Sequence, residues 1–418
     1  MKAEAINYIL EWLAGAGAGR FVGYTAERQR FGEYNVVIIP SGHFGNGLPA
    51  EPLTQIDGVP LLFGRDEVTR VGDTIVVYAD IVASTFFLIS RYEEVLQRDK
   101  RDEHGRFPGK ASLPYRQGFI HRPVADEYAA LLQGWLRHTG VPLPPAPAYP
   151  HLNTLYLTHD VDAPFLYRSW KGFARSLLHH RGLTASLQSK FGAPTHDPWY
   201  TFPQLFTLDN ELAHTFGTPP CQVIYFFKAS GHTPLDKPHY SLSSPDIRSL
   251  LHAIRLQPHT AIGLHASYHA GLHPSAIAHE KIALEQAINA PVTLNRHHFL
   301  ALREPEHTDF LESAGITDDF TLGYADTAGY RLGTSRPVRY IHPTSFRLSN
   351  LTLHPLTAMD TSLLHPRYMS LTPSQAVAHT LQIIHNAARL HGDASLLWHN
   401  SSDITPYALL TKLLHPSS

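Results

Sequence analysis

The second half of the chain alternates short apolar runs with longer amphipathic stretches. The apolar runs predict buried strands at residues 155–157, 223–227, 261–264, 292–294 and 395–398. Between them, apolar residues recur at helical spacing, as in Ile247, Leu250, Leu251 and Ile254. Strands that alternate with helices are typical of a parallel sheet covered by helices, so this half is predicted to be an α/β fold.

Two helix starts in this half have recognisable capping signals. Thr372 and Gln375 have the spacing of a capping box, with Pro373 at the first helical position. Asp197 followed by Pro198 predicts a second helix start, with its helix running towards residue 215. Both predictions place helices between strands, as the alternation requires.

The first half has a less regular pattern, which predicts a smaller α/β unit. A short amphipathic helix is expected near residues 6–13, strands at 36–39, 61–63 and 73–78, and a helix at 79–96. Prolines crowd residues 141–150, which favours an extended and stiff connector. We therefore expect an N-terminal α/β domain of unknown role at 1–140, a linker at 141–150 and a second domain at 151–418.

Composition narrows the class of protein. Of the 418 residues, 43% are hydrophobic and 17% are charged, as in globular chains with a large core. The formal net charge of -2 argues against general affinity for nucleic acid or for an anionic membrane. The first residues do not form a signal-peptide pattern, and polar residues interrupt the most apolar stretch, 74–90. From these two observations the chain is expected to be cytoplasmic and not inserted in a membrane. The single cysteine, Cys221, fits a reducing compartment.

Polar residues that can carry chemistry follow several of the predicted strands. They are Asp160, Asp162, His265, Arg296 and His399. The carboxyl ends of parallel strands meet at one mouth in barrel folds, so we expect these side chains to converge. Two carboxylates one residue apart also need a cation, a shared proton or solvation.

A metal site is the interpretation that accounts for most of these residues. His265 and His269 are four residues apart, and on a helical turn both would face the same ion. With Asp162 as a third ligand, the set suits Zn²⁺, and also Co²⁺, Ni²⁺ or Fe²⁺. We therefore expect a divalent metal, with zinc as the first choice, between Asp162, His265 and His269.

From about residue 149 onwards the chain resembles the polysaccharide deacetylases of carbohydrate esterase family four, which share a NodB-type domain. Residues 158–162 (THDVD) are similar to the first motif of that family. The resemblance implies that Asp160 is the general base and Asp162 a metal ligand. Residues 263–269 are similar to the second motif, which implies that His265 and His269 bind the metal.

Three further segments extend the resemblance. Residues 296–299 are similar to the third motif, which implies that Arg296 orients the base beside the oxyanion site. Residues 396–400 are similar to the fifth motif, which implies that His399 is the general acid. Residues 326–331 lie where the fourth motif belongs, and Asp326 is our candidate for the carboxylate that raises the pKa of His399.

The chain departs from the family pattern at these motifs. His298 stands where the family has proline, the fourth motif lacks its tryptophan, and Asn400 replaces the proline after His399. His298 could replace His269 as a ligand if the turn at residues 267–268 points His269 away. In the first half, residues 90–94 and 105–107 resemble an uncharacterised domain found ahead of such deacetylases in bacteria.

The resemblance implies a distorted (β/α) barrel of the deacetylase type after the smaller α/β domain. It implies a metal-dependent amide hydrolase that removes an N-acetyl group from a sugar of a bacterial surface glycan or its precursor. The alternative is a catalytically degenerate relative that binds glycan or assembles with biosynthetic partners, and a hydrolase of a non-sugar amide is a third option. A homo-oligomer or a glycan-biosynthesis complex is compatible with each of these hypotheses.

Overall fold

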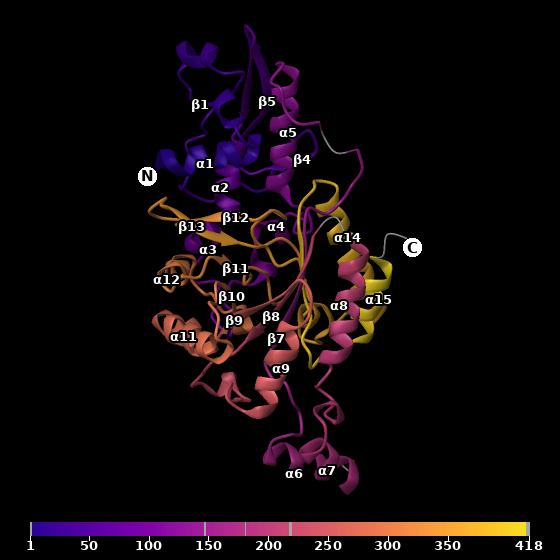
Figure 1. Ribbon diagram of the computed structural model, residues 1–418. Helices are drawn as coiled ribbons and strands as arrows, with labels where there is room; N and C mark the ends of the chain where they lie inside the picture. The colour runs from indigo at the N-terminus through magenta and orange to yellow at the C-terminus, as the bar shows by residue number, and fades with distance from the viewer. Residues whose placement is uncertain (1, 146–147, 180, 217–219, 415–418) are drawn as a thin grey trace.

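The structure is a computed structural model that describes residues 2–145, 148–179, 181–216 and 220–414. Within these residues the fold is mixed α/β, with a four-stranded sheet in the first half and a curled nine-stranded sheet in the second. Figure 1 shows the first half at one end of the molecule, next to β12 (Val338–Ile341) and β13 (Leu348–Leu353). The curled, mainly parallel sheet with helices around it is barrel-like.

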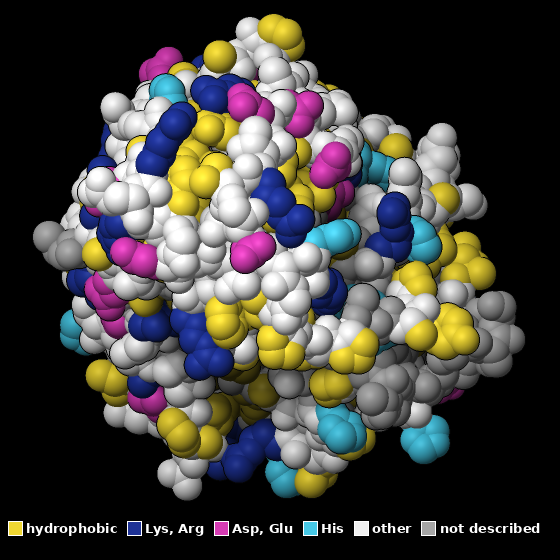
Figure 2. All heavy atoms as spheres, turned by 90° about the horizontal axis from the view of Figure 1, so that it is seen from above, with side chains coloured by type: hydrophobic (Ala, Val, Ile, Leu, Met, Phe, Trp, Pro, Cys, Tyr) yellow, Lys and Arg dark blue, Asp and Glu magenta, His cyan; other side chains and the backbone are white. Residues whose placement is uncertain are grey.

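The first half packs helices against a small mixed sheet with the order β1-β2-β6-β5. Only β5 runs antiparallel to its neighbour. The elements are α1 (Lys2–Ala14), β1 (Val22–Tyr24), β2 (Val36–Ile38), β3 (Thr54–Ile56), β4 (Val59–Leu61), β5 (Gly64–Val71), β6 (Thr74–Ala79), α2 (Ile81–Ile89), α3 (Tyr92–Leu96), α4 (Leu113–Arg116) and α5 (Val124–His138). Seen from above, this end of the molecule has basic and acidic side chains interspersed among hydrophobic ones (Figure 2).

The large sheet has the order β12-β13-β11-β10-β9-β8-β7-β15-β14. All of its neighbouring strands run parallel except the pair β12 and β13. Its remaining strands are β7 (Leu155–Val161), β8 (Cys221–Phe227), β9 (Thr260–Ala266), β10 (Leu294–His297), β11 (Asp318–Asp319), β14 (Ala358–Met359) and β15 (Ala394–Leu397). The parallel arrangement predicted from the alternation of apolar runs and amphipathic stretches is therefore present.

Strand β7 is longer than the apolar run that predicted it, because its polar residues are paired with neighbouring strands. The hydroxyl of Thr158 donates to the carbonyl of Leu396, and Nδ1 of His159 is hydrogen-bonded to the carbonyl of Trp398. All seven residues of β7 are buried. The strand consequently includes Asp160 and ends directly before Asp162.

Helices alternate with the strands of the second half. They are α6 (Trp170–Leu178), α7 (Leu183–Phe191), α8 (Phe202–Phe216), α9 (Pro245–Arg255), α10 (Tyr268–Leu272), α11 (Ile277–Ile288), α12 (Asp309–Ser313), α13 (Asp360–Leu364), α14 (Pro373–Ala388) and α15 (Thr405–Leu413). The capping box of Thr372 and Gln375 is confirmed at the start of α14. No helix in the described part of the chain is long and apolar enough to cross a membrane.

Two helix predictions were wrong at their boundaries. Asp197 does not start a helix: its carboxylate accepts from the backbone N–H groups of Leu166 and Tyr167, and α8 begins at Phe202. The predicted helix at 79–96 is broken into α2 and α3, because Arg91 takes a left-handed conformation (φ 59°). That conformation directs its guanidinium to Glu94 and to the carbonyl of Leu302.

The two halves share a continuous hydrophobic core and several buried polar contacts. The carboxylate of Glu94 lies between Arg91 (2.5 Å) and Arg331 (2.9 Å), and all three side chains are almost fully buried. Asp126 accepts hydrogen bonds from Thr334 and Ser335. The division at the proline-rich residues 141–150 stays a prediction, and residues 146–147 of that segment lie outside the described residues.

Candidate metal centre

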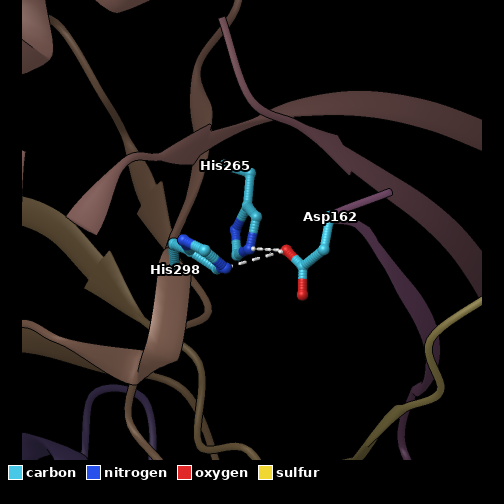
Figure 3. Close-up of side chains that lie close together, drawn as sticks. All are labelled: Asp162, His265 and His298. Atoms are coloured by element: carbon cyan, nitrogen blue, oxygen red, sulfur yellow. Dashed lines mark hydrogen bonds and ion pairs between the residues drawn. The ribbon is translucent and has the colours of Figure 1, made fainter. Parts of the chain in front are cut away.

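Asp162, His265 and His298 form a three-residue group that could hold a metal ion. One potential ligand atom from each lies within 4.8 Å of the others. Oδ1 of Asp162 is 3.0 Å from Nε2 of His265 and 3.3 Å from Nε2 of His298 (Figure 3). The three residues come from the end of β7, from β9, and from the 3-10 turn His298–Leu300 that follows β10.

The hydrogen bonding of His265 fixes which of its nitrogens carries a proton. Nδ1 of His265 lies 2.9 Å from the backbone carbonyl of Arg296, and a carbonyl only accepts, so Nδ1–H donates. In the neutral ring Nε2 then carries no proton, and its lone pair faces a carboxylate oxygen of Asp162. Two acceptors at 3.0 Å repel one another unless a cation or an additional proton lies between them.

His298 is supported from behind by a second carboxylate. Its Nδ1 lies 3.6 Å from Oδ1 of Asp236, which is fully buried. Burial alone would raise the pKa of Asp236, but the nearby imidazole of His298 and hydrogen bonds from Thr233 outweigh it and hold that pKa below its usual range. A carboxylate behind an imidazole is common at metal sites, where it orients the ring and raises its basicity.

Asp160 and Arg296 form a buried pair next to this group. Nη1 of Arg296 donates to Oδ1 of Asp160 (3.1 Å) and to the hydroxyl of Thr158 (2.7 Å). The guanidinium is inaccessible to solvent, and its Nε donates to the carbonyl of Phe320. The other oxygen of Asp160 lies 3.6 Å from Nε2 of His265, so this carboxylate is held in a fixed position beside the candidate metal site.

His399 completes the group on the opposite side of Asp162. Its Nε2 lies 3.6 Å from Oδ2 of Asp162, and its Nδ1 is 2.7 Å from Oδ1 of Asp360. Burial lowers the pKa of His399, but the carboxylate of Asp360 outweighs it and, with the carboxylates at 160 and 162, raises the pKa to about 10. A cation at Asp162 would oppose this shift.

Asp326 was the wrong candidate for the carboxylate beside His399. Its oxygens accept from the backbone N–H groups of Gly109 and Lys110, so it joins the two halves of the chain. Asp360 takes the position instead, at the end of the two-residue strand β14. The apolar-run signal used for the other sites does not identify it, because β14 has only two residues.

His269 does not lie in the three-residue group with His265. The expectation that both face one ion required a shared helical turn, but His265 belongs to β9 and His269 to α10, with Ser267 capping that helix between them. The ring of His269 packs against His273 and His232, with centroid distances of 4.6 and 5.3 Å. The structure therefore places His298, the open alternative, next to Asp162, and the ligand roles stay predictions.

A cavity of about 160 Å³ opens onto these residues. Its lining comprises Arg106, Asp160, Asp162, His265, His298, Phe299, Leu300, Ala325, Met359, Thr361, Tyr368 and His399. Arg106 comes from the first half of the chain, and its Nη1 donates to the carbonyl of Phe299 (2.8 Å). Phe299 and Leu300 both have positive φ (62° and 54°), a strained backbone for non-glycine residues.

Comparisons with known proteins give matches to a family model and to a solved structure. Residues 6–140 match a family model described as a family of unknown function, DUF7033. Among solved structures, the chain is similar to a Mycobacterium smegmatis protein provisionally assigned as a polysaccharide deacetylase. The identity is 15% and the TM-score 0.41, over 66% of this chain and 87% of that one. No curated protein matches the chain. Because this TM-score is low, the description of the fold is based on the strand order given above and not on this similarity.

Proposed function

We propose that the protein is a metal-dependent hydrolase that removes an N-acetyl group from a sugar of a bacterial surface glycan or its precursor. We further propose that its second half is a distorted (β/α) barrel of the deacetylase type. The observation that supports this most strongly is the 3.0 Å contact of Nε2 of His265 with Oδ1 of Asp162, beside the buried pair of Asp160 and Arg296.

The residues present fit a divalent cation. Asp162, His265 and His298 supply one oxygen and two nitrogens, a donor set that suits Zn²⁺ and also Co²⁺, Ni²⁺ or Fe²⁺. When bound there, such an ion would act as a Lewis acid towards an acyl carbonyl and would make water more acidic. Asp236 would keep the ring of His298 oriented for this role.

Asp160 is the proposed general base. Its carboxylate lines the cavity, and Arg296 holds one of its oxygens while the other remains close to His265. In this position it would accept a proton from the water whose oxygen attacks the carbonyl carbon.

His399 is the proposed general acid. Asp360 orients it through Nδ1, which leaves Nε2 directed at Asp162 and the cavity. As the C–N bond breaks, Nε2 would donate a proton to the departing nitrogen, so that the products are acetate and a free amine. The apolar side chains of Leu300 and Met359 in the cavity wall suit a small acyl group such as acetyl.

The test is release of acetate from N-acetylhexosamine oligosaccharides by protein loaded with Zn²⁺ or Co²⁺, with Asp160→Asn as the matched variant. Acetate release that requires metal and is lost in Asp160→Asn supports the proposal. Protein that carries stoichiometric metal but releases no acetate from a broad glycan panel contradicts it. Protein that takes up no metal at all favours the degenerate, glycan-binding alternative.

A further inference from the structure

The helices α6 and α7 form a hairpin that buries small and polar side chains and exposes large apolar ones. The buried residues of the two helices are Gly172, Ser176, Ser186 and Ser189. The hydroxyls of Ser176 and Ser186 are hydrogen-bonded to each other at 2.6 Å, so the helices meet through small and polar side chains. Figure 1 shows the hairpin projecting from the end of the molecule opposite the N-terminal half.

The large apolar side chains of the hairpin face solvent instead. Trp170 is 68% exposed, Leu178 77%, Leu183 62% and Phe191 62%. On α7, Leu183, Leu187 and Phe191 follow a spacing of four residues and therefore share one face. The rings of Trp170 and Phe191 lie 5.8 Å apart, which links this face to α6. Exposed apolar side chains grouped in this way mark a surface that binds a partner.

The charge of the same segment has only one sign. Between Asp162 and Asp197 the chain has five Lys or Arg residues and no Asp or Glu. The five are Arg168, Lys171, Arg175, Arg181 and Lys190. The N-terminal end of the molecule, in contrast, mixes both signs (Figure 2). The net charge of -2 for the whole chain thus conceals a local basic region.

The base of the hairpin is fixed to the body of the protein. Arg168 pairs with Asp246 of α9 at 2.5 Å, and the carboxylate of Asp197 accepts from the N–H groups of Leu166 and Tyr167. Lys171 and Arg175, in contrast, are exposed. They line a groove of about 800 Å³ between the hairpin and residues 237–247. The cations at this groove are therefore available to bind anions from outside.

We propose that the α6–α7 hairpin docks on an anionic lipid bilayer. A helix with a Trp, Leu and Phe face and basic side chains lies in the membrane interface, with the apolar residues among the acyl chains and the cations at the headgroups. A second copy of the same chain is disfavoured as the occupant, because two hairpins with five cations each and no carboxylates repel one another.

The hairpin is close in the chain to the candidate metal centre. The chain passes from Asp162 at the end of β7 to the start of α6 at Trp170, and Tyr240, which lines the groove, donates from its hydroxyl to the carbonyl of Val161. Docking would therefore bring the cavity towards the headgroup layer. If the hydrolase function proposed above holds, the substrate is then an N-acetylated sugar anchored in the bilayer, a consequence that rests on that proposal whereas the docking does not.

Vesicle flotation tests the docking without any measurement of activity. The intact protein is mixed with vesicles of phosphatidylcholine alone or of phosphatidylcholine with phosphatidylglycerol. We expect flotation with the anionic vesicles and release at high salt. Lys171→Gln with Arg175→Gln should weaken binding more than tenfold, since each cation near the surface contributes roughly fivefold. Leu178→Ser with Leu183→Ser should weaken it to a similar extent.

Matched controls come from other surfaces of the protein. Arg28→Gln with Arg70→Gln removes two exposed cations of the first half, and Leu256→Ser removes an apolar side chain that is 69% exposed directly after α9. Both controls should float like the unmodified protein. Wild-type protein that stays in the soluble fraction with anionic vesicles, or hairpin variants that bind as tightly as the controls, would overturn the proposal. A dimer that dissociates in the Leu178→Ser, Leu183→Ser variant would assign the face to a second copy instead.

Discussion

Nε2 of His265 lies 3.0 Å from Oδ1 of Asp162, and because Nδ1 donates to a backbone carbonyl, both facing atoms are acceptors when the imidazole is neutral. A divalent cation between them would remove the repulsion and would be shared with His298. We therefore expect purified protein to hold about one equivalent of metal per chain. Metal analysis after dialysis measures this directly.

The two histidines that could serve as third ligand are distinguished by substitution. His298→Ala should lower the affinity for Zn²⁺ by roughly hundredfold or more, because even residues outside the first coordination shell typically contribute ten- to hundredfold. His269→Ala should leave the affinity unchanged, since that ring packs against His232 and His273. Competition with a chromogenic chelator gives both values. Loss of metal in His269→Ala with retention in His298→Ala would contradict the assignment.

Asp160→Asn tests the proposed general base independently of the proposed metal. The amide is nearly isosteric but cannot accept the proton, so kcat on an N-acetylated substrate should fall by roughly 100- to 10,000-fold. Metal content should remain near the wild-type value, because Asp160 is not one of the three grouped residues. A variant that loses the metal together with its activity would instead make Asp160 a ligand.

Asp360→Asn should lower turnover most for substrates whose leaving group must be protonated as it departs. Asp360 orients His399 and stabilises its charged form, so the variant should be a poorer proton donor. Turnover of an N-acetyl amide should fall at least tenfold, whereas turnover of an activated acetyl ester, whose leaving group departs as an anion, should change little. Equal losses on both substrates would point to a structural role for Asp360.

The sequence predicted the parallel sheet and the group of polar residues at its strand ends because both depend on local patterns. An apolar run followed by a polar residue marks a strand end, and the ends of parallel strands meet. Hence Asp160, Asp162, Arg296 and His399 lie together in the structure, as expected.

Other features depend on contacts that no local pattern reveals. The interpretation of His265 and His269 as a helical pair failed because β9 continues through Ala266 before α10 begins. Asp360 follows a strand of only two residues, too short to stand out as an apolar run. Arg106 reaches the cavity from a segment almost 200 residues before Phe299, a pairing that only the folded chain shows.

Arg106 links the first half of the chain to the cavity, and we expect it to act through position. It holds the carbonyl of Phe299, next to His298, while Asp102 fixes its own guanidinium. Arg106→Ala should lower kcat by roughly ten- to hundredfold through misplacement of that turn, with little change in KM. Arg106→Lys should not restore it, because one ammonium cannot bridge both partners.

The control for Arg106 is Arg122→Ala, which removes a guanidinium paired with Glu127 in the same half of the chain. Its kcat should equal the wild-type value. If both variants lower kcat to the same extent, general destabilisation explains the loss. If neither does, the first half has no part in positioning the site.

Glu94 makes the stability of the protein dependent on pH. Burial would raise its pKa, but Arg331 and Arg91 outweigh it and lower the pKa to about 2. Because the unfolded state binds this proton more readily, the contribution of Glu94 to stability is complete above the ordinary glutamate pKa and is lost as the pH falls towards 2.

Glu94→Gln should lower the free energy of unfolding at pH 7 by roughly 3–5 kcal/mol, since two buried cations lose their carboxylate partner. Glu33→Gln removes the partner of the exposed Arg30 and should change it by less than about 0.5 kcal/mol. Urea unfolding at pH 7 and pH 4 measures both, and a Glu94→Gln variant as stable as Glu33→Gln at pH 7 would show that the buried cluster does not join the two halves.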